Sequence, residues 1–331
     1  MKSSSALFPV TLLNAETHGD FNEDVYLLKH NRCSDPSVQI ALTHISKAAD
    51  VPGEKPPLVL VHGSFTNRSF WLSAKGIGLA RHLLDEGFDV WLFEHRGHGL
   101  SPRNQAYRKN TLEQYVHSDV TAVNDFVREK TGQKPGWIGH SLGGVLIASA
   151  AACGVLSSEN THSLVMFGTQ AVRRPWYLWL PPVGSLMRLF VRVKGELEGR
   201  KLKIGPENES AGIINEHLGR QDWTIGWKFK VRRQPLLRLW QQTDLPLLAV
   251  AAIADSSDPE KYCRRFYDLY GGSDKSYLVL GKAQGFSRDY GHVDMVASKP
   301  AGDDVWPKIS DWLKQRHVAQ QIAAHADSIV Q

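Results

Sequence analysis

Cysteine is scarce in this sequence, and the few cysteines that occur are far apart. The 331 residues include three, Cys33, Cys153 and Cys263, with no Cys-x-x-Cys pair among them. An odd and widely spaced set of this kind indicates neither a structural zinc site nor a thiol redox motif. It suits a reducing compartment, so we predict a cytoplasmic protein without a bound metal ion.

Long hydrophobic runs are also missing. Residues 176–193 come closest to an uncharged apolar stretch of about 18 residues, but two prolines interrupt them and Arg188 and Arg192 lie among them. We therefore predict no transmembrane helix. The N-terminal residues lack a clear apolar run, so no signal peptide is predicted either.

Charge of neither sign dominates the chain. Charged residues make up 22% of it, the net charge is +5, and no Lys/Arg run is long enough to act as a nucleic-acid-binding arm. We therefore expect no nucleic-acid partner. The hydrophobic fraction of 42% is ordinary for a globular protein. The length allows one large domain with a substantial insertion.

Short apolar runs alternate with amphipathic stretches over most of the chain. Strands are predicted at residues 58–61, 89–93, 137–140, 164–167, 245–252 and 277–280, and helices at 76–87, 112–130, 142–152, 258–270 and 305–317. This alternation predicts an α/β fold in which helices wrap a mostly parallel sheet. Residues 1–56 contain short alternating runs, which we expect to form strands leading into that sheet.

One block interrupts the alternation. Residues 172–243 hold five of the ten tryptophans, together with many basic residues and several prolines. We therefore predict that residues 57–171 and 244–331 form the α/β core and that residues 172–243 are inserted into it.

A serine stands between two glycines in Gly139-His140-Ser141-Leu142-Gly143. The motif lies between a predicted strand and a predicted helix, which is the setting of a nucleophile elbow. Such a turn is so tight that neighbouring side chains would clash, hence the glycines, and it pushes the serine hydroxyl into the cleft at the carboxyl end of the sheet. The start of the following helix favours developing negative charge. We therefore predict that Ser141 is a catalytic nucleophile.

Other stretches accompany this motif, namely Val61-His62-Gly63-Ser64, Gly87-Phe88-Asp89-Val90-Trp91-Leu92, Arg96-Gly97-His98-Gly99-Leu100-Ser101 and Tyr290-Gly291-His292-Val293-Asp294-Met295. Together with residues 139–144 they resemble the α/β-hydrolase superfamily, and within it the acid-lipase and serine-esterase branch. The resemblance covers residues 55–170 and 244–315. It implies an α/β-hydrolase fold with the insertion as a helical cap or lid over the active site. It also implies a triad in the chain order Ser, Asp, His.

The resemblance places the other two members of the triad. His292 is the predicted base, because it follows the last predicted core strand. The acid is predicted at Asp255, nine residues after Pro246, where the family usually carries it. Asp258 is the alternative acid. Its position before a proline and a predicted helix also fits a helix N-cap, with the proline at the first helical position.

The loop after the first core strand is predicted to help bind the oxyanion. In the resembled family a backbone N–H of this loop and the N–H of the residue after the nucleophile do so. This points to Ser64, with Phe65 as the alternative, and to Leu142. We expect His62 to be a buried residue that fixes this loop, and Arg96 to be scaffolding paired with a carboxylate.

These assignments predict a serine hydrolase that cleaves carboxylic esters through an acyl-enzyme and needs no cofactor. The same triad also suits cleavage of amides, thioesters or C–C bonds, or acyl transfer to an alcohol. An alternative of another class is a non-catalytic ligand receptor built on the same fold.

Substrate binding is assigned to the insertion. Trp176 and Trp179, with the apolar residues of 186–190, would line an apolar pocket or face a lipid interface, ringed by basic residues such as Arg188 and Arg192. Aromatic and basic residues together are typical of an interfacial lid; packing only against the core is the alternative. Under the first interpretation the substrate is a small ester or lipid with an apolar acyl chain, and the protein contacts a membrane surface peripherally.

Overall fold

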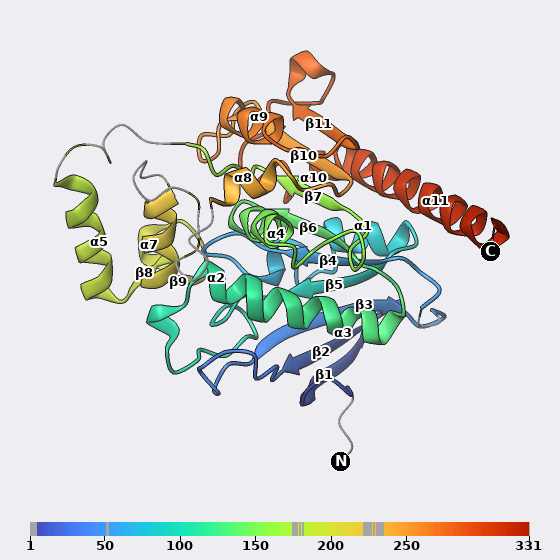
Figure 1. The fold of residues 1–331 in the computed structure, drawn as a ribbon, viewed down its shortest axis with the longest axis horizontal. Coiled ribbons are helices and arrows are strands. Elements are labelled where there is room, and N and C mark those ends of the chain that lie inside the picture. The colour runs from blue at the N-terminus through green and yellow to red at the C-terminus, as the bar shows by residue number, and fades with distance from the viewer. Residues whose placement is uncertain are drawn as a thin grey trace.

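The computed structural model describes residues 5–50, 53–173, 178, 180, 182–220, 227, 229 and 235–330, and for residues 220 and 319–330 it describes the backbone. Within these residues the centre of the molecule is a nine-stranded sheet in the order β1-β2-β3-β5-β4-β6-β7-β10-β11. A separate two-stranded sheet pairs β8 with β9. Figure 1 shows the large sheet crossing the middle of the molecule with helices around it.

The strands have the following bounds: β1 Val10–His18, β2 Phe21–Leu28, β3 Ile40–Lys47, β4 Pro57–Val61, β5 Asp89–Phe93, β6 Gly136–His140, β7 Leu164–Phe167, β8 Glu196–Glu198, β9 Asn208–Ser210, β10 Leu247–Ala252 and β11 Lys275–Leu280. The helices are α1 Leu79–Asp85, α2 Leu112–Gln114, α3 Thr121–Thr131, α4 Leu142–Ala152, α5 Val183–Lys194, α6 Gly199–Leu202, α7 Ala211–Arg220, α8 Leu236–Trp240, α9 Glu260–Asp268, α10 Lys299–Asp304 and α11 Trp306–Val330.

The sheet is parallel from β5 to β11 and antiparallel at its other edge. β4, β5, β6, β7, β10 and β11 pair in parallel, whereas β1, β2 and β3 form antiparallel pairs and β3 joins β5 antiparallel. Every residue of β4, β6 and β10 is buried, as expected of parallel strands covered on both faces. The predicted fold class, a mostly parallel sheet flanked by helices, is confirmed.

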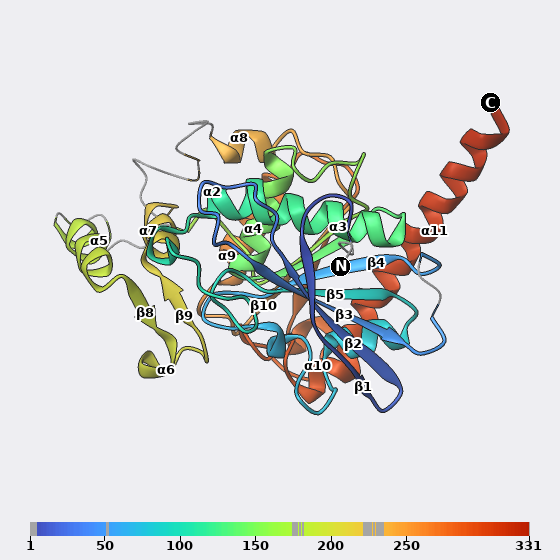
Figure 2. The ribbon, with the colours of Figure 1, turned by 90° about the horizontal axis from the view of Figure 1, so that it is seen from below.

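Helices cover both faces of the sheet, as Figures 1 and 2 show. On one face α3, α4 and α8 contribute buried residues to one core cluster, among them Phe126, Leu146 and Trp240. On the other face α1 and α11 contribute to a second cluster, among them Leu83 and Ile309. These two layers of buried apolar side chains hold the sheet rigidly, so that the ends of its strands can position a site.

Three elements differ in detail from the sequence-based prediction. The helix predicted at 112–130 contains a π-helical stretch, Tyr115–Val120, between α2 and α3. The helix predicted at 258–270 is shorter and begins at Glu260. The last helix runs on to Val330 instead of ending near residue 317.

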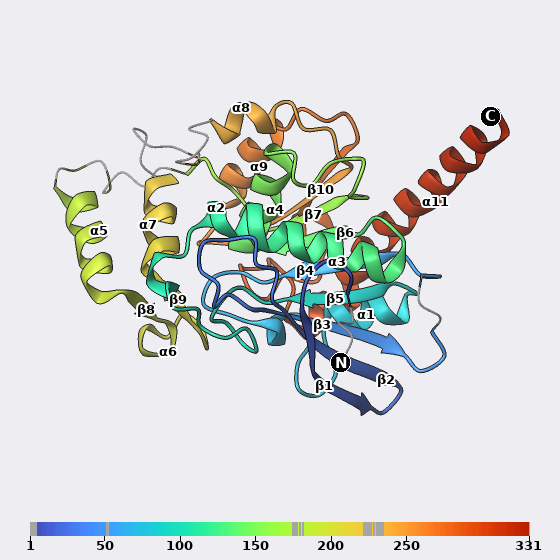
Figure 3. The ribbon, with the colours of Figure 1, turned by 60° about the horizontal axis from the view of Figure 1, so that its bottom comes forward.

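The segment between β7 and β10 carries α5 to α8 and the small β8–β9 sheet. α5 packs against α7, and α8 packs against α4 of the core. Figures 1 and 3 show α5 and α7 side by side at the end of the molecule farthest from the C-terminus of α11. None of the helices in the described part of the chain combines the length and apolar character that a membrane span needs.

Candidate active site

The predicted nucleophile lies in a strained turn between β6 and α4. Ser141 has a φ of 53° and a ψ of −115°, a conformation that residues with a side chain rarely adopt. Its backbone N–H donates to the carbonyl of Phe167 at the end of β7, at 2.9 Å, and its own carbonyl accepts from Val145 in α4, at 3.0 Å. The hydroxyl is thus held at the carboxyl edge of the parallel strands, where open α/β sheets carry their ligand sites.

The glycines around Ser141 are required by the close approach of other backbone atoms. A β-carbon at Gly139 would lie 2.5 Å from the backbone nitrogen of Gly144, and one at Gly143 would lie 2.3 Å from the carbonyl oxygen of Val61. Neither site has room for a side chain. The motif therefore has a steric reason in this fold: α4 begins directly against β4 and β6.

His292 and Asp255 form a hydrogen-bonded pair at the same edge of the sheet. Nδ1 of His292 lies 2.8 Å from Oδ2 of Asp255, whose side chain is buried. The other carboxylate oxygen, Oδ1, accepts from the backbone N–H groups of Ser257 and Asp258, both at 2.8 Å. These bonds fix the carboxylate in place, and the carboxylate in turn fixes the orientation and the tautomer of the imidazole.

Gly168 makes room for this pair, and the sequence analysis did not single it out. It follows β7 with a φ of +49°, and a β-carbon there would lie 3.0 Å from Oδ2 of Asp255 and 3.1 Å from Nδ1 of His292. The signal was present in the sequence as a glycine directly after a predicted strand, Leu164–Phe167. It could not be interpreted without knowing which side chains approach that strand end.

The pKa of His292 is raised above its ordinary value of 6.5. Burial of the ring lowers it, but the hydrogen bond and charge of Asp255 and the charge of Asp258 outweigh burial. The imidazolium is therefore stabilised by two carboxylates. A histidine in this setting can both accept and return a proton near neutral pH.

Asp258 lies beside Ser141 and does not occupy the predicted capping position. Helix α9 begins at Glu260 with Pro259 at its N-cap, so the expectation that Asp258 caps this helix, with the proline as first helical residue, is wrong. Oδ2 of Asp258 lies 3.5 Å from Oγ of Ser141, and Oδ1 accepts from Nε2 of Gln170 at 2.7 Å. The structure thus separates the two candidate acids: Asp255 contacts the histidine, and Asp258 contacts the serine.

The loop after β4 touches the nucleophile turn, as the predicted oxyanion site requires. A β-carbon at Gly63 would lie only 3.2 Å from the β-carbon of Ser141. Leu142 is the first residue of α4, so its N–H has no partner within the helix. Phe65 has a left-handed φ of 60°. Both Ser64 and Phe65 remain candidates for the second N–H donor.

Residues of the segment between β7 and β10 contact the loop after β4. The carbonyl of Phe65 accepts from the backbone N–H of Glu207 at 2.9 Å. The Glu207 carboxylate accepts from Nδ2 of Asn67 at 2.5 Å and from the N–H of Gly99 at 3.2 Å. A β-carbon at Gly205 would lie 2.1 Å from the carbonyl oxygen of Phe65. The predicted oxyanion loop is therefore packed between the sheet and the insertion.

Two residues expected to be scaffolding have scaffolding contacts. His62 is fully buried, its Nδ1 lies 2.8 Å from the carbonyl of Gly63, and burial holds its pKa well below 6.5. Because its Nε2 accepts from the N–H of His95 at 3.2 Å, the proton is assigned to Nδ1. Arg96 makes a buried bidentate ion pair with Asp119, at 2.7 and 2.6 Å.

His140 is a residue of the site that the sequence analysis left without a role. It is buried, and its Nε2 lies 2.8 Å from the carbonyl oxygen of His292, with the two rings 4.5 Å apart. This contact joins the strand that carries Ser141 to the loop that carries His292. Because a carbonyl oxygen can only accept, Nε2 carries the proton and donates in this bond, while burial lowers the pKa of the ring well below 6.5 and favours its neutral form.

The predicted substrate-binding side chains of Trp176 and Trp179 lie outside the described residues. Most apolar residues of α5 are exposed: Leu186, Leu189 and Phe190 are each more than half exposed. On this helix only Gly184 and Val191 are buried. The helix thus presents apolar side chains to its surroundings and does not pack them against the core.

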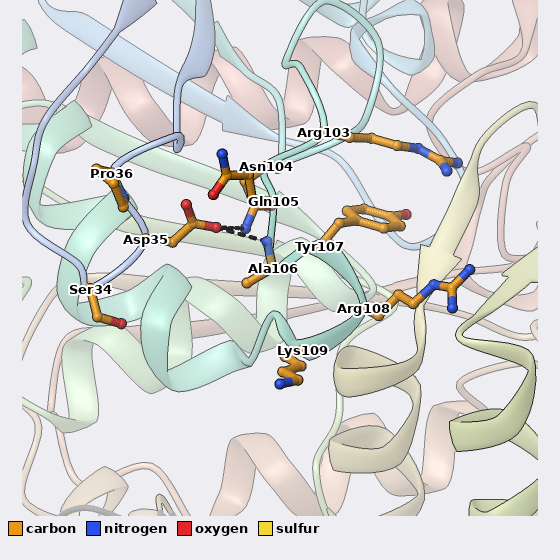
Figure 4. Close-up of a pocket in the computed structure, with 10 residues that line it drawn as sticks. All are labelled: Ser34, Asp35, Pro36, Arg103, Asn104, Gln105, Ala106, Tyr107, Arg108 and Lys109. Atoms are coloured by element: carbon orange, nitrogen blue, oxygen red, sulfur yellow. Dashed lines mark hydrogen bonds between the residues drawn. The ribbon is translucent and has the colours of Figure 1, made fainter.

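A cavity of about 630 Å³ lies elsewhere on the molecule, lined by residues 34–36 and 103–109. Figure 4 shows Asp35 there, bonded to Nδ2 of Asn104 and to the N–H of Ala106, at 2.7 and 2.9 Å. Its lining includes none of the three predicted triad residues. Within the described ranges, no group of three or more His, Cys, Asp or Glu side chains is placed to hold a metal ion.

Known proteins resemble this chain in both sequence and fold. Residues 56–197 match the family model described as alpha/beta hydrolase fold. Human gastric triacylglycerol lipase is 33% identical over 130 residues, which is 37% of this chain and 30% of that lipase. This chain therefore spans less than a third of the length of that relative.

Among solved structures, the monoacylglycerol lipase of Paleococcus ferrophilus matches with a TM-score of 0.55 and 18% identity, covering 79% of this chain and 96% of that one. A thermophilic esterase from Thermogutta terrifontis matches with a TM-score of 0.58 and 19% identity, covering 84% of this chain and 95% of that one. These structural matches confirm the predicted fold, and the sequence match to gastric triacylglycerol lipase supports the predicted resemblance to lipases.

Proposed function

We propose that this chain, which has the α/β-hydrolase fold and resembles lipases in sequence, hydrolyses carboxylic esters with Ser141, His292 and Asp255 as its catalytic triad. One observation carries the proposal: the hydrogen-bonded pair of His292 and Asp255, at 2.8 Å, stands at the same strand ends as the strained Ser141 turn. Nucleophile, acid and base stand in the chain order Ser, Asp, His of this fold.

The proposed reaction has two acyl-transfer steps. His292 takes the hydroxyl proton of Ser141 on Nε2, the ring nitrogen opposite the one that faces Asp255, and the serine oxygen attacks the ester carbonyl. The imidazolium gives the proton to the departing alcohol, leaving an acyl-enzyme. Water, deprotonated by His292, then releases the acid and restores Ser141.

Negative charge on the carbonyl oxygen would be stabilised by backbone donors. The N–H of Leu142 at the start of α4 is one proposed donor, and the N–H of Ser64, or alternatively Phe65, is the other. Removing one oxyanion donor typically costs ~10²–10³ in rate. No cofactor takes part in these steps.

We further propose that residues 172–243 form a cap over this site and bring it to a lipid surface. The exposed apolar side chains of α5 support this, because Leu186, Leu189 and Phe190 stand beside Arg188 and Arg192 on the same helix. A helix with exposed apolar and basic residues binds at the interface of anionic lipid. The proposed substrates are accordingly esters with apolar acyl chains.

A substrate panel with a nucleophile variant tests the ester-hydrolase proposal. We expect the unmodified protein to hydrolyse p-nitrophenyl esters, with higher kcat/KM for medium or long acyl chains than for acetate. Ser141→Ala should lower kcat by ~10⁴ or more. A fluorophosphonate probe should label the unmodified protein and leave Ser141→Ala unlabelled.

Several results would contradict the proposal. An unchanged rate in Ser141→Ala would show that Ser141 is not the nucleophile. The absence of labelling in the unmodified protein would favour a non-catalytic ligand receptor. Turnover of matched amides or thioesters but not of esters would keep the triad and change the substrate. Exclusive use of acetyl esters would count against apolar acyl chains.

A further inference from the structure

A second carboxylate faces the proposed nucleophile in addition to the triad acid. Oδ2 of Asp258 lies 3.5 Å from Oγ of Ser141. Asp255, only three residues earlier, already supplies the carboxylate that contacts His292. The triad mechanism uses one acid, so the second needs an explanation of its own.

The Asp258 side chain is held in place from the opposite side. Its Oδ1 accepts from Nε2 of Gln170 at 2.7 Å, and Gln170 is only 6% exposed. The side-chain oxygen of Gln170, Oε1, accepts from the backbone N–H groups of Val172 and Arg173, at 2.9 and 2.7 Å. These bonds orient the side-chain amide so that its NH2 group faces Asp258. The carboxylate is therefore built into the site and is not a surface charge that happens to lie near it.

The Asp258 backbone is fixed as well. Its N–H donates to Oδ1 of Asp255 at 2.8 Å, so the two carboxylates belong to one bonded loop. Nη1 of Arg173 donates to the carbonyl of Ser257 at 2.6 Å and ties this loop to the segment after β7. Asp258 is consequently as well positioned as Asp255, but toward a different atom.

A bound ester must place its substituents close to this carboxylate. The ester carbonyl carbon forms a bond to Oγ of Ser141, so substituent atoms three or four bonds from that carbon can come within reach of Oδ2 of Asp258. An apolar group in that place removes water from the carboxylate and offers nothing in return, which is costly. A hydroxyl or ammonium group restores the lost hydrogen bond.

We infer that Asp258 is a specificity-determining residue that selects esters bearing a hydroxyl or ammonium donor three or four bonds from the scissile carbonyl carbon. The inference rests on the proposed ester hydrolysis by Ser141 and adds the substrate class to it. It predicts that good substrates carry a hydrogen-bond donor close to the reacting carbon and an apolar acyl chain farther from it.

Matched substrates test it directly on the unmodified protein. One pair differs on the alcohol side, 2-hydroxyethyl butanoate against propyl butanoate, and one on the acyl side, ethyl 3-hydroxybutanoate against ethyl 3-methylbutanoate. We expect kcat/KM to favour the hydroxyl compound by about tenfold or more in at least one pair, the size of a hydrogen bond to a charged group. A ratio near one in both pairs would overturn the inference.

A charge-neutral variant locates the effect. Asp258→Asn should reduce the hydroxyl preference about fivefold or more, because charge-assisted hydrogen bonds are roughly twice as strong as neutral ones. Asp268→Asn makes the same chemical change at an exposed position at the far end of α9 and should keep the preference. An unchanged preference in Asp258→Asn would assign the selection to other groups and refute the role of Asp258.

The outcomes separate this inference from the proposed function. If Ser141→Ala retains the full rate, ester hydrolysis by this triad fails. If Ser141→Ala is inactive while the isosteric pairs are used equally, only the Asp258 inference fails. Should Asp258→Asn not fold, the ratios measured on the unmodified protein still decide.

Discussion

The sheet core and the inserted segment treat their apolar side chains in opposite ways. In the core, β4, β6 and β10 are buried throughout, and so is every residue of α4. In the insertion, α5 buries two of its twelve residues, and Phe190 is 60% exposed. The core is stabilised by its own packing, whereas α5 leaves most of its apolar side chains exposed.

Under the proposed function, the two regions would have different roles. The proposed catalytic groups of His292 and Asp255 lie at the buried strand ends, which hold their geometry. The proposed lipid-binding surface belongs to the exposed helix α5. Substitutions that displace the proposed triad should therefore change kcat on every substrate, and substitutions of the exposed apolar residues of α5 should change activity only on lipid surfaces.

The largest effect is expected from replacing the proposed triad acid, Asp255. Asp255→Asn should lower kcat by ~10⁴ on a soluble p-nitrophenyl ester, because the imidazole of His292 loses the partner that fixes its tautomer. Asp258→Asn, which leaves the His292–Asp255 pair intact, should lose less than about tenfold, with circular dichroism confirming both folds. The reverse order of effects would transfer the role of acid to Asp258.

A smaller effect is expected from crowding the pair without removing either member. Gly168→Ala places a methyl group 3.0 Å from Asp255 and 3.1 Å from His292, and a displacement of about 1 Å in a catalytic group costs ~10² in rate. Gly154→Ala is the matched control, since its φ of +72° imposes similar backbone strain with nothing within 4 Å. Equal kcat values for the two variants would show that backbone strain, and not contact with the pair, decides.

On the insertion, the effect should depend on the form of the substrate. The double variant Leu186→Ser and Phe190→Ser should weaken binding to vesicles of phosphatidylcholine and phosphatidylglycerol by about tenfold, because both exposed apolar groups are lost from the contact. The rate on soluble p-nitrophenyl acetate should stay the same. Ile77→Ser is the control. Ile77 belongs to the α/β region but is 64% exposed, so its replacement should change neither vesicle binding nor the rate on p-nitrophenyl acetate. An equal loss of vesicle binding in the double variant and in Ile77→Ser would contradict the proposed role of α5 in lipid binding.

The smallest expected effect is a shift in the pH profile. His292 must be neutral to accept a proton, so kcat/KM is full above its pKa and falls as the pH drops through it. Because Asp255 and Asp258 raise this pKa, the midpoint of the acid limb should lie above pH 6.5. Asp258→Asn removes one raising charge and should move the limb to lower pH, whereas Asp268→Asn should not. A shift in the opposite direction would contradict the electrostatic account of His292.

The parts of the molecule that were predictable from the sequence depend on local chemistry. Alternating apolar and amphipathic runs predicted the core strands and helices, because burial on both faces leaves a simple pattern. The spacing of Gly139, Ser141 and Gly143 predicted the turn, because only glycine fits where β4 and β6 meet α4. Family resemblance then distinguished His292 from the other histidines.

The parts that were not predictable depend on contacts between distant residues. Asp255 and Asp258 follow the same strand, and the sequence cannot say which of them reaches His292. The answer lies in how the loop folds back, with Asp255 accepting from the N–H groups of Ser257 and Asp258. The partner of Asp258, Gln170, is 88 residues away and belongs to no motif. The role of His140 likewise depends on a contact across the site, 152 residues away.

The contacts of Glu207 and Gly205 with the loop at Phe65 have a consequence for evolution and engineering. Under the proposed function this segment would both meet the substrate and support the backbone of the proposed oxyanion loop, so it would not be an interchangeable module. Replacing residues 172–243 with the corresponding piece of a relative would alter selectivity and would also remove the bond from Glu207 to Phe65, at 2.9 Å. Divergence in this segment is therefore constrained at the backbone contacts of Glu207 and Gly205 with Phe65, in addition to any constraint from the proposed lipid binding by α5.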